Sequence, residues 1–195
     1  MIQIFPGRLS LALAVFLLCA MPFPGAQSHR AKSAGKTTTK PEEHSLAHDV
    51  RHQLQVLPYY SVFDFIAFTV ESGKVTLSGQ VVRPTLRTDA EAAVRSIEGV
   101  GSVNNLIEVL PKSFSDDELR RGVYRAIFED EVLQRYAVSE LPAIHILVKE
   151  GAVALKGVVA SEGDKNLAGA RASGVSGVAG VKNRLAVRAK DAPAN

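Results

Sequence analysis

An internal repeat is the feature that most constrains the fold of this chain. The stretch ESGKVTLSGQVV (71–82) aligns with KEGAVALKGVVA (149–160) at a shift of 78 residues. At the same shift, and without a gap, GVGSVNNLIEV (99–109) aligns with GVAGVKNRLAV (177–187). Self-similarity at a fixed shift indicates a duplicated supersecondary unit. The sequence therefore predicts two copies of one small module, called here the first and the second module.

Each module is predicted to begin with a helix. Apolar residues recur at helical spacing, which predicts one buried helix face per module: Leu46, Val50, Leu54 and Leu57 in the first, Leu119, Val123 and Ile127 in the second. Ser115 and Glu118 have the spacing of a capping box for the second of these helices. The neighbouring acidic pair Asp116-Asp117 and the run 129–131 are predicted to be solvated.

A β-hairpin is predicted to follow each first helix. Apolar residues alternate with a period of two on both sides of a short turn that contains Gly73 or Gly151. Gly79 and Gly157 fall at inward positions, where a glycine permits the close approach of another backbone, which we expect to be a crossing helix.

A second helix and a last strand complete each module. Leu86, Ala90, Ala93, Val94 and Ile97 form the apolar face of this helix in the first module. Gly99 and Gly177 are predicted to end the two helices as left-handed caps. The predicted fold class is α+β, with two tandem αββαβ modules. Each is a small three-stranded mixed sheet with two helices on one face.

The N-terminus has the pattern of a secretory signal peptide. Arg8 precedes an apolar run from Leu9 to Met21, which is shorter than the roughly 20 residues of a spanning helix. Cys19, the only cysteine, would be removed with this segment, so the mature chain could form neither disulfides nor thiolate metal sites. The predicted division is signal peptide 1–26, flexible linker 27–43, first module 44–112, second module 115–188 and disordered tail 189–195.

The repeated motif resembles the BON domain. It reads Gly-x-Val-x-Leu-x-Gly-x-Val, then a helix, then Gly-Val-x-x-Val-x-Asn, and it occurs at 73–81 with 99–105 and at 151–159 with 177–183. In this family the recurrent glycines are fold residues: Gly73, Gly79, Gly99, Gly151, Gly157 and Gly177. The resemblance implies a periplasmic envelope protein that associates with phospholipid membranes and helps to maintain the envelope under stress. It implies no catalytic residue and no cofactor.

Composition agrees with a binding protein and leaves two partners open. A net charge of +3 without a dense basic stripe argues against a nucleic-acid binder. No nucleophile with a base, paired carboxylates or phosphate-binding loop is present in the sequence, so an enzyme is not expected. The expected partner is an anionic phospholipid surface. The alternative is a periplasmic chaperone or adaptor that binds envelope proteins through exposed sheet surface.

One face of the second sheet is the candidate lipid-binding site. If Ile144, Ile146 and Val148 point inward, then His145, Leu147 and Lys149 point outward. The cations that share this outward face are Lys156, Lys182, Arg184 and Arg188. A basic, partly apolar face suits an anionic membrane. The matching face of the first module carries Thr76, Ser78, Gln80, Asn104 and Glu108 and is less basic.

Two further groups of residues are candidates for binding. His44, His48 and His52 lie four residues apart on one helix face, a spacing that can hold a metal ion, but this face is out of phase with the apolar one and is predicted to be solvated. No metal site is therefore expected. Phe65 and Phe68 are predicted core residues, whereas Tyr59 and Tyr60 are compatible with either a core or a lipid interface.

Overall fold

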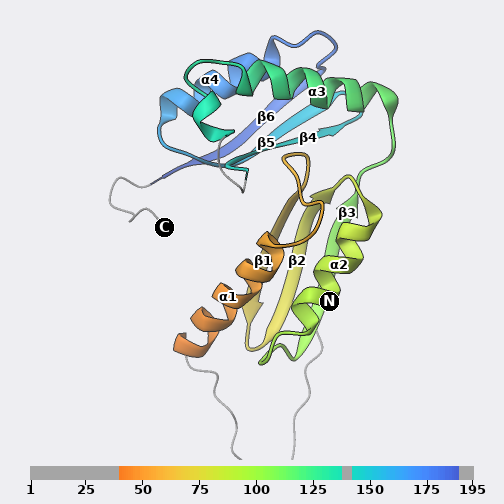
Figure 1. The fold of residues 1–195 in the computed structure, drawn as a ribbon, viewed down its shortest axis with the longest axis vertical. Coiled ribbons are helices and arrows are strands. Elements are labelled where there is room, and N and C mark those ends of the chain that lie inside the picture. The colour runs from red at the N-terminus through yellow and green to blue at the C-terminus, as the bar shows by residue number, and fades with distance from the viewer. Residues whose placement is uncertain (1–39, 138–141, 189–195) are drawn as a thin grey trace, which may run out of the picture. The chain divides into compact units, whose positions relative to one another are not determined.

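The computed structural model describes residues 40–137 and 142–188. The first module contains the elements α1 (Lys40–Gln55), β1 (Phe65–Glu71), β2 (Lys74–Val81), α2 (Pro84–Arg95) and β3 (Ser102–Val109), drawn in Figure 1. The second module contains α3 (Phe114–Phe128), the short 3-10 helix η1 (Gln134–Tyr136), β4 (Ile144–Lys149), β5 (Ala152–Val159), α4 (Glu162–Ser173) and β6 (Gly180–Val187). No helix among the described residues is long and apolar enough to cross a membrane.

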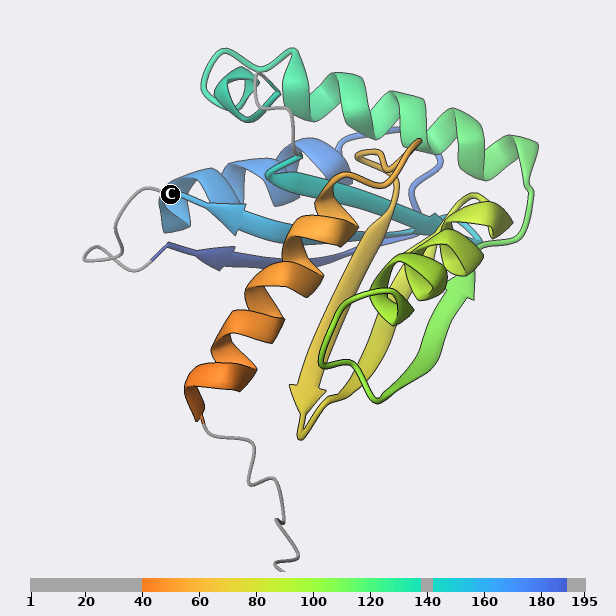
Figure 2. The same ribbon diagram turned by 60° about the horizontal axis from the view of Figure 1, so that its bottom comes forward.

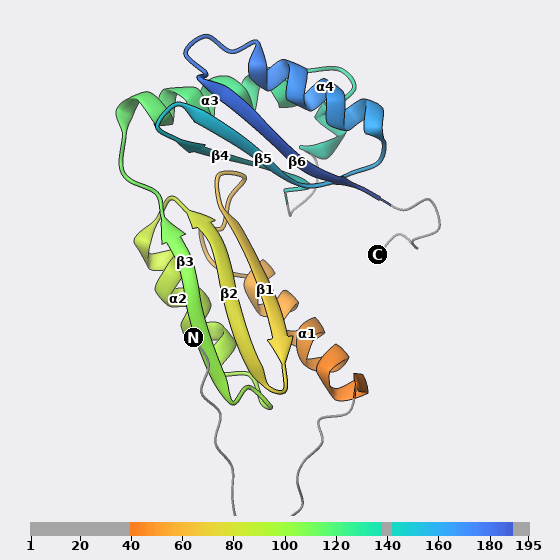
Figure 3. The same cartoon turned by 180° about the vertical axis from the view of Figure 1, so that it is seen from behind.

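Both sheets have the predicted mixed topology. The strand orders are β1-β2-β3 and β4-β5-β6. The first two strands of each sheet form an antiparallel hairpin, and the last strand runs parallel to the middle one. In Figure 3, the strands of the first module lie in front of α1 and α2, so both helices cover the same face of that sheet. The predicted α+β fold of two tandem αββαβ modules is confirmed.

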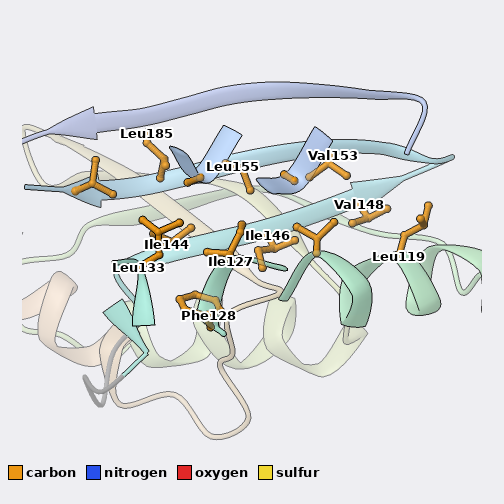
Figure 4. Packing of buried hydrophobic residues seen from close by; sticks show 14 residues of the cluster. Leu119, Ile127, Phe128, Leu133, Ile144, Ile146, Val148, Val153, Leu155 and Leu185 are labelled. Carbon is orange, nitrogen blue, oxygen red and sulfur yellow. The ribbon is translucent and has the colours of Figure 1, made fainter. Parts of the chain in front are cut away.

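Each module has its own hydrophobic core between helices and sheet. In the first, the predicted stripe of α1 is buried together with Leu77, Leu86 and Ile107. In the second, Leu119 and Ile127 of α3 pack on Ile146, Leu155 and Leu185 (Figure 4). The predicted apolar faces of both first helices are therefore confirmed, as are the buried positions Leu86, Ala90 and Val94 of α2.

The asparagine of the repeated motif joins the last strand to the second helix. Asn105 donates from its side-chain amide to the carbonyl of Arg87 at 2.8 Å, and Asn183 donates to that of Lys165 at 2.6 Å. The same side chains accept from backbone amides two residues later. This local chemistry explains why both copies carry asparagine at this position.

The structure corrects the predicted role of two glycine pairs. A Cβ at Gly79 or Gly157 would lie 2.0 or 2.1 Å from a carbonyl oxygen at the start of the neighbouring strand, and both residues have positive φ. The close backbone is therefore strand β1 or β4 and not a crossing helix. Gly99 and Gly177 do have positive φ, but they lie in the turn beyond the helix, whose C-caps are Ser96 and Gly174 with right-handed φ.

The predicted capping box of α3 is also wrong. Ser113 is the N-cap, and its side chain accepts from the amide of Asp116. The carboxylate of Asp116 is buried and accepts from the amides of Glu150 and Gly151 at 3.0 and 2.9 Å, in the turn between β4 and β5. Neither Asp116 nor Asp130 is solvated, because backbone amides recruit both carboxylates, and Asp130 also pairs with Arg171 at 2.7 Å.

Candidate functional site

The four predicted cations lie on the face of the second sheet that points away from α3 and α4. Lys156 of β5 is the register partner of Arg184 of β6, and Lys182 lies opposite Ala154. The intervening residues Leu155 and Leu185 point into the core. Because side chains alternate along a strand, the cations gather on the opposite face. We call these four residues, Lys156, Lys182, Arg184 and Arg188, the basic face.

Three members of the basic face are fully available to a partner. Lys182, Arg184 and Arg188 are exposed, and within the described residues none of them forms a salt bridge. Lys156 is half-buried, and its ammonium lies 4.6 Å from the centroid of the Phe65 ring. Burial, assisted by the charge of Arg184, lowers the pKa of Lys156. The sequence pattern identified this cation but could not show that an aromatic ring covers it.

The β4 side of the same face is not open. The outward orientation predicted for this row of β4 is correct, but His145 and Leu147 are only 7% and 2% exposed, and Lys149 alone of the row is exposed. The rings of Tyr60 and Phe65 lie 5.7 and 5.4 Å from the imidazole of His145. Phe65 therefore packs on His145 and Lys156 and is not part of the first core, whereas Phe68 packs against that core as predicted. This burial lowers the pKa of His145.

Among the residues that the structure describes, the matching face of the first module carries no comparable cluster of cations. Gln80 donates to the carboxylate of Glu108 at 2.6 Å, and Lys149 donates to the other carboxylate oxygen at 2.7 Å. The Lys149 contact, followed by the Gln80 contact, lowers the pKa of Glu108. The charge of Lys149 is thus compensated by the carboxylate of Glu108. Among the described residues, the cations of this face without a salt bridge lie on β5, on β6 and at Arg188, directly after β6.

Comparison with known proteins identifies the repeat. The family model of the BON domain matches residues 45–111 and 115–189. The chain belongs to the BON domain family. Domains of this family are associated in general with phospholipid binding and with the cell envelope, and they are binding domains. The chain carries two such domains, which are its first and second BON modules.

The remaining comparisons are weak. Functionally curated proteins give no significant sequence match. Among solved structures, the chain is similar to CdsD, a structural protein of the type III secretion system of Chlamydia trachomatis. The identity is 13% and the TM-score 0.31, over 75% of this chain and 94% of that one. The CdsD C-terminal domain gives 13% identity and a TM-score of 0.27, over 74% and 98%. At these TM-scores the likeness carries no functional argument.

The second BON module has another exposed surface that the sequence analysis missed. On α3, the side chains of Phe114 and Tyr124 are 77% and 39% exposed, and Arg121 and Arg125 line a hollow beside Tyr124 and Phe63. The sequence shows that a phenylalanine, Phe114, lies just before the predicted start of this helix. Its exposure was not predictable, because the helix was expected to begin two residues later.

The other candidate residues lie apart from the basic face. His44, His48 and His52 are exposed on α1, on the side opposite its buried stripe. Tyr59 is 69% exposed and lies under the guanidinium of Arg83, 4.8 Å from ring centroid to charge centre. Tyr60 is half-buried beside His145. The predicted signal peptide, Cys19 and the tail from 189 to 195 fall outside the described residues.

Proposed function

We propose that this protein is an exported, non-enzymatic protein of the bacterial envelope that binds anionic phospholipid through the basic face and helps to maintain the envelope under stress. The observation that carries the proposal is a set of three exposed cations on one sheet face, with no salt bridge to any described residue. Membership of the BON family supports a phospholipid partner. The N-terminal sequence pattern supports export to the periplasm.

The expected attachment is weak and sensitive to salt. Each cation close to an anionic membrane surface contributes about 1 kcal/mol. Three exposed cations therefore contribute about 3 kcal/mol, which corresponds to a preference of roughly a hundredfold for anionic over neutral surfaces. Because the Debye length falls as salt rises, this preference should decline in concentrated salt.

Co-sedimentation with vesicles tests the proposal. The chain from Gln27 onward keeps every described residue and is mixed with phosphatidylglycerol-containing or pure phosphatidylcholine vesicles over a salt series. We expect binding to the anionic vesicles only, and a loss of at least tenfold in the triple variant Lys182→Gln/Arg184→Gln/Arg188→Gln. The matched control Arg121→Gln/Arg125→Gln removes cations from α3 and should bind within twofold of the unmodified chain.

Two results would overturn this proposal. Absence of binding to both kinds of vesicle would exclude phospholipid as the partner. A loss of binding in the control variant, with the triple variant unaffected, would move the lipid site to the aromatic and basic surface of α3. Circular dichroism of all variants checks that the substitutions, which fall on exposed residues, leave the fold intact.

A further inference from the structure

An open hollow runs along the free edge of strand β1 of the first BON module, and residues of the second module also line it: Pro142, Ala143, His145, Gly157, Val158 and Arg188. Its volume is about 850 Å³, and it is bordered by Ala47, Arg51 and Leu54 of α1, which runs beside β1 (Figure 2). The β1 side of the hollow is formed by the consecutive residues 65–68 and by Val70. Because successive side chains of a strand point to opposite faces, a row of consecutive residues lines one hollow only along the strand edge. We call this hollow the β1 groove.

The edge of β1 presents unused backbone hydrogen-bonding groups to the groove. In an antiparallel pair, every second residue directs its amide and carbonyl away from the partner strand. On β1 these residues are Ile66, Phe68 and Val70, since the amide of Ile66 donates outward to the hydroxyl of Tyr60 at 3.3 Å. Within the described residues, the amides of Phe68 and Val70 have no hydrogen-bond partner.

The same edge of the second BON module is already occupied. The amide of Ile146 donates to the carbonyl of Val62 at 2.8 Å, and the side chains of Val62 and Phe63 pack against the second core. Phe63 meets the ring of Tyr124 on α3 in a T-shaped contact, with ring centroids 6.1 Å apart. The carbonyl of Val148 accepts from Arg120 of α3 at 2.7 Å. The chain thus lays its own backbone beside β4.

The repeat identifies the equivalent positions and their differences. At the strand shift of 78 residues, Phe68 corresponds to Ile146 and Val70 to Val148. The first helices align at a shift of 73, so Ala47 stands where the second module has Arg120. The β1 groove therefore lacks the arginine that caps the strand edge in the second module. At the position of Tyr124, it has Arg51.

We propose that the β1 groove binds an extended segment of a partner protein, which adds to β1 as a further strand. The segment places a backbone carbonyl on the amide of Phe68, as Val62 does on Ile146. Free edges bind extended peptides through main-chain hydrogen bonds, and flanking pockets select the side chains. This site is separate from the basic face of the proposed lipid function, apart from Arg188, which borders both.

Charge indicates which segment fits. Arg51 and Arg188 border the groove, whereas the one carboxylate among its described lining residues, that of Glu43, already accepts from the amide of Ser72 at 2.9 Å. The remaining lining is largely apolar. The expected ligand is therefore an extended segment of β-branched residues that carries a single carboxylate toward Arg51.

Peptide titration tests this proposal. The probes are two fluorescent eight-residue peptides of alternating valine and threonine, one with a central glutamate and the other with a central lysine. We expect the glutamate peptide to bind at least fivefold more tightly by fluorescence anisotropy. In NMR spectra of the unmodified chain, its binding should slow hydrogen exchange at the amides of Phe68 and Val70 at least tenfold, a readout that requires no variant.

A variant that copies the second module closes the groove. His44→Asp with Ala47→Arg reproduces the Asp117–Arg120 pair at the aligned positions and supplies a guanidinium for the carbonyl of Val70. We expect at least tenfold weaker peptide binding. Two controls should bind the peptide as the unmodified chain does. One is His48→Arg, on the exposed side of α1, and the other is the basic-face variant Lys182→Gln/Arg184→Gln.

Each contrary result overturns the proposal in a distinct way. Failure of both peptides to bind, or unchanged exchange at Phe68 and Val70, removes a peptide as occupant. Concentration-dependent dimerisation that the double variant abolishes would identify a second copy of this chain instead. If anionic vesicles compete with the peptide for the unmodified chain but not for the basic-face variant Lys182→Gln/Arg184→Gln, the groove is part of the membrane site.

Discussion

At the scale of single residues, the imidazole of His145 couples the fold to pH. It is buried beside the rings of Tyr60 and Phe65, its Nδ1 has no hydrogen-bond partner, and its register partner on β5 is Lys156. Burial lowers its pKa, and the nearby Asp64 opposes this shift only in part. Protonation therefore costs free energy in the folded state but not in the unfolded chain, where the pKa is about 6.5.

The pH dependence of stability follows from this difference. Above about pH 7 the free energy of unfolding is at its full value, and it falls as the pH drops below about 6.5, because the unfolded chain binds a proton that folded His145 does not. The expected loss is up to about 1.4 kcal/mol per pH unit. Urea titrations at pH 7.5 and 5.5 measure it. His145→Gln should reduce the change in the free energy of unfolding between pH 7.5 and 5.5, whereas His52→Gln, at an exposed position, should not. An equal change in both variants would contradict the assignment of this pH dependence to His145.

Residue-level prediction from the sequence succeeded where periodicity decides and failed where neighbours in space decide. The inward positions of Gly79 and Gly157 follow from period-two patterning. Their actual neighbour, the adjacent strand, depends on a positive φ that no residue pattern reports. Likewise, alternation placed His145 on the outer face of β4 correctly, but only the contact with residues 60–65 shows that this position is buried.

At the scale of elements, Asp116 fixes helix α3 to the hairpin of β4 and β5. Its buried carboxylate accepts from the amides of Glu150 and Gly151, and Glu150 has a positive φ of 52°. Asp116→Ala leaves two turn amides without their acceptor and is expected to lower the free energy of unfolding by about 2–3 kcal/mol. Chemical denaturation measures this loss.

The same helix provides the control for Asp116. Glu118 is exposed, and Glu118→Ala should change the free energy of unfolding by less than about 0.5 kcal/mol. If Asp116→Ala proves equally mild, the carboxylate is not what holds the turn. The docking of Asp116 also explains why the N-cap was predicted at the wrong serine. Both Ser113 and Ser115 precede an acidic residue by three positions, and only the contact of Asp116 with the turn makes Ser113 the N-cap.

Helix α4 shows why tertiary contacts override local propensity. Its glycines predict a weak helix, yet Ala168 and Ala172 are fully buried against the sheet. A Cβ at Gly169 would lie 2.7 Å from the side-chain amide of Asn183, the residue that donates to the carbonyl of Lys165. The link itself does not require a glycine, because in the first module Glu91 occupies the aligned position and Asn105 still donates to the carbonyl of Arg87.

At the scale of the whole chain, the two BON modules have one fold but different surfaces. The sequences of their strands align at a single shift of 78 residues, so the sequence was sufficient to predict both folds and the difference in charge between the two sheet faces. It could not predict that residues 62 and 63, which precede the first sheet, complete the second core. This contact depends on residues far apart in the chain, and periodicity carries no information about it.

This shared segment predicts that a substitution in the first module weakens the second. Phe63 packs against the second core and on Tyr124, so Phe63→Ala removes apolar contact from that core. Because Phe63 is only half-buried, the expected loss is about 1–2 kcal/mol, below the 3–5 kcal/mol of a fully buried phenylalanine. Native-state hydrogen exchange should show the loss at the amides of Ile146 and Leu155, while Leu77 of the first core keeps its protection.

The control for this coupling is Val56→Ala, at a position that is 60% exposed in the same connecting segment. It should leave the exchange of both cores unchanged. If Phe63→Ala weakens the first core instead, the segment belongs energetically to its own module, and the occupied edge of β4 ceases to be a precedent for the β1 groove. If only the second core responds, strand β4 depends on a backbone supplied from outside its own repeat, which is the role that the β1 groove leaves for a partner.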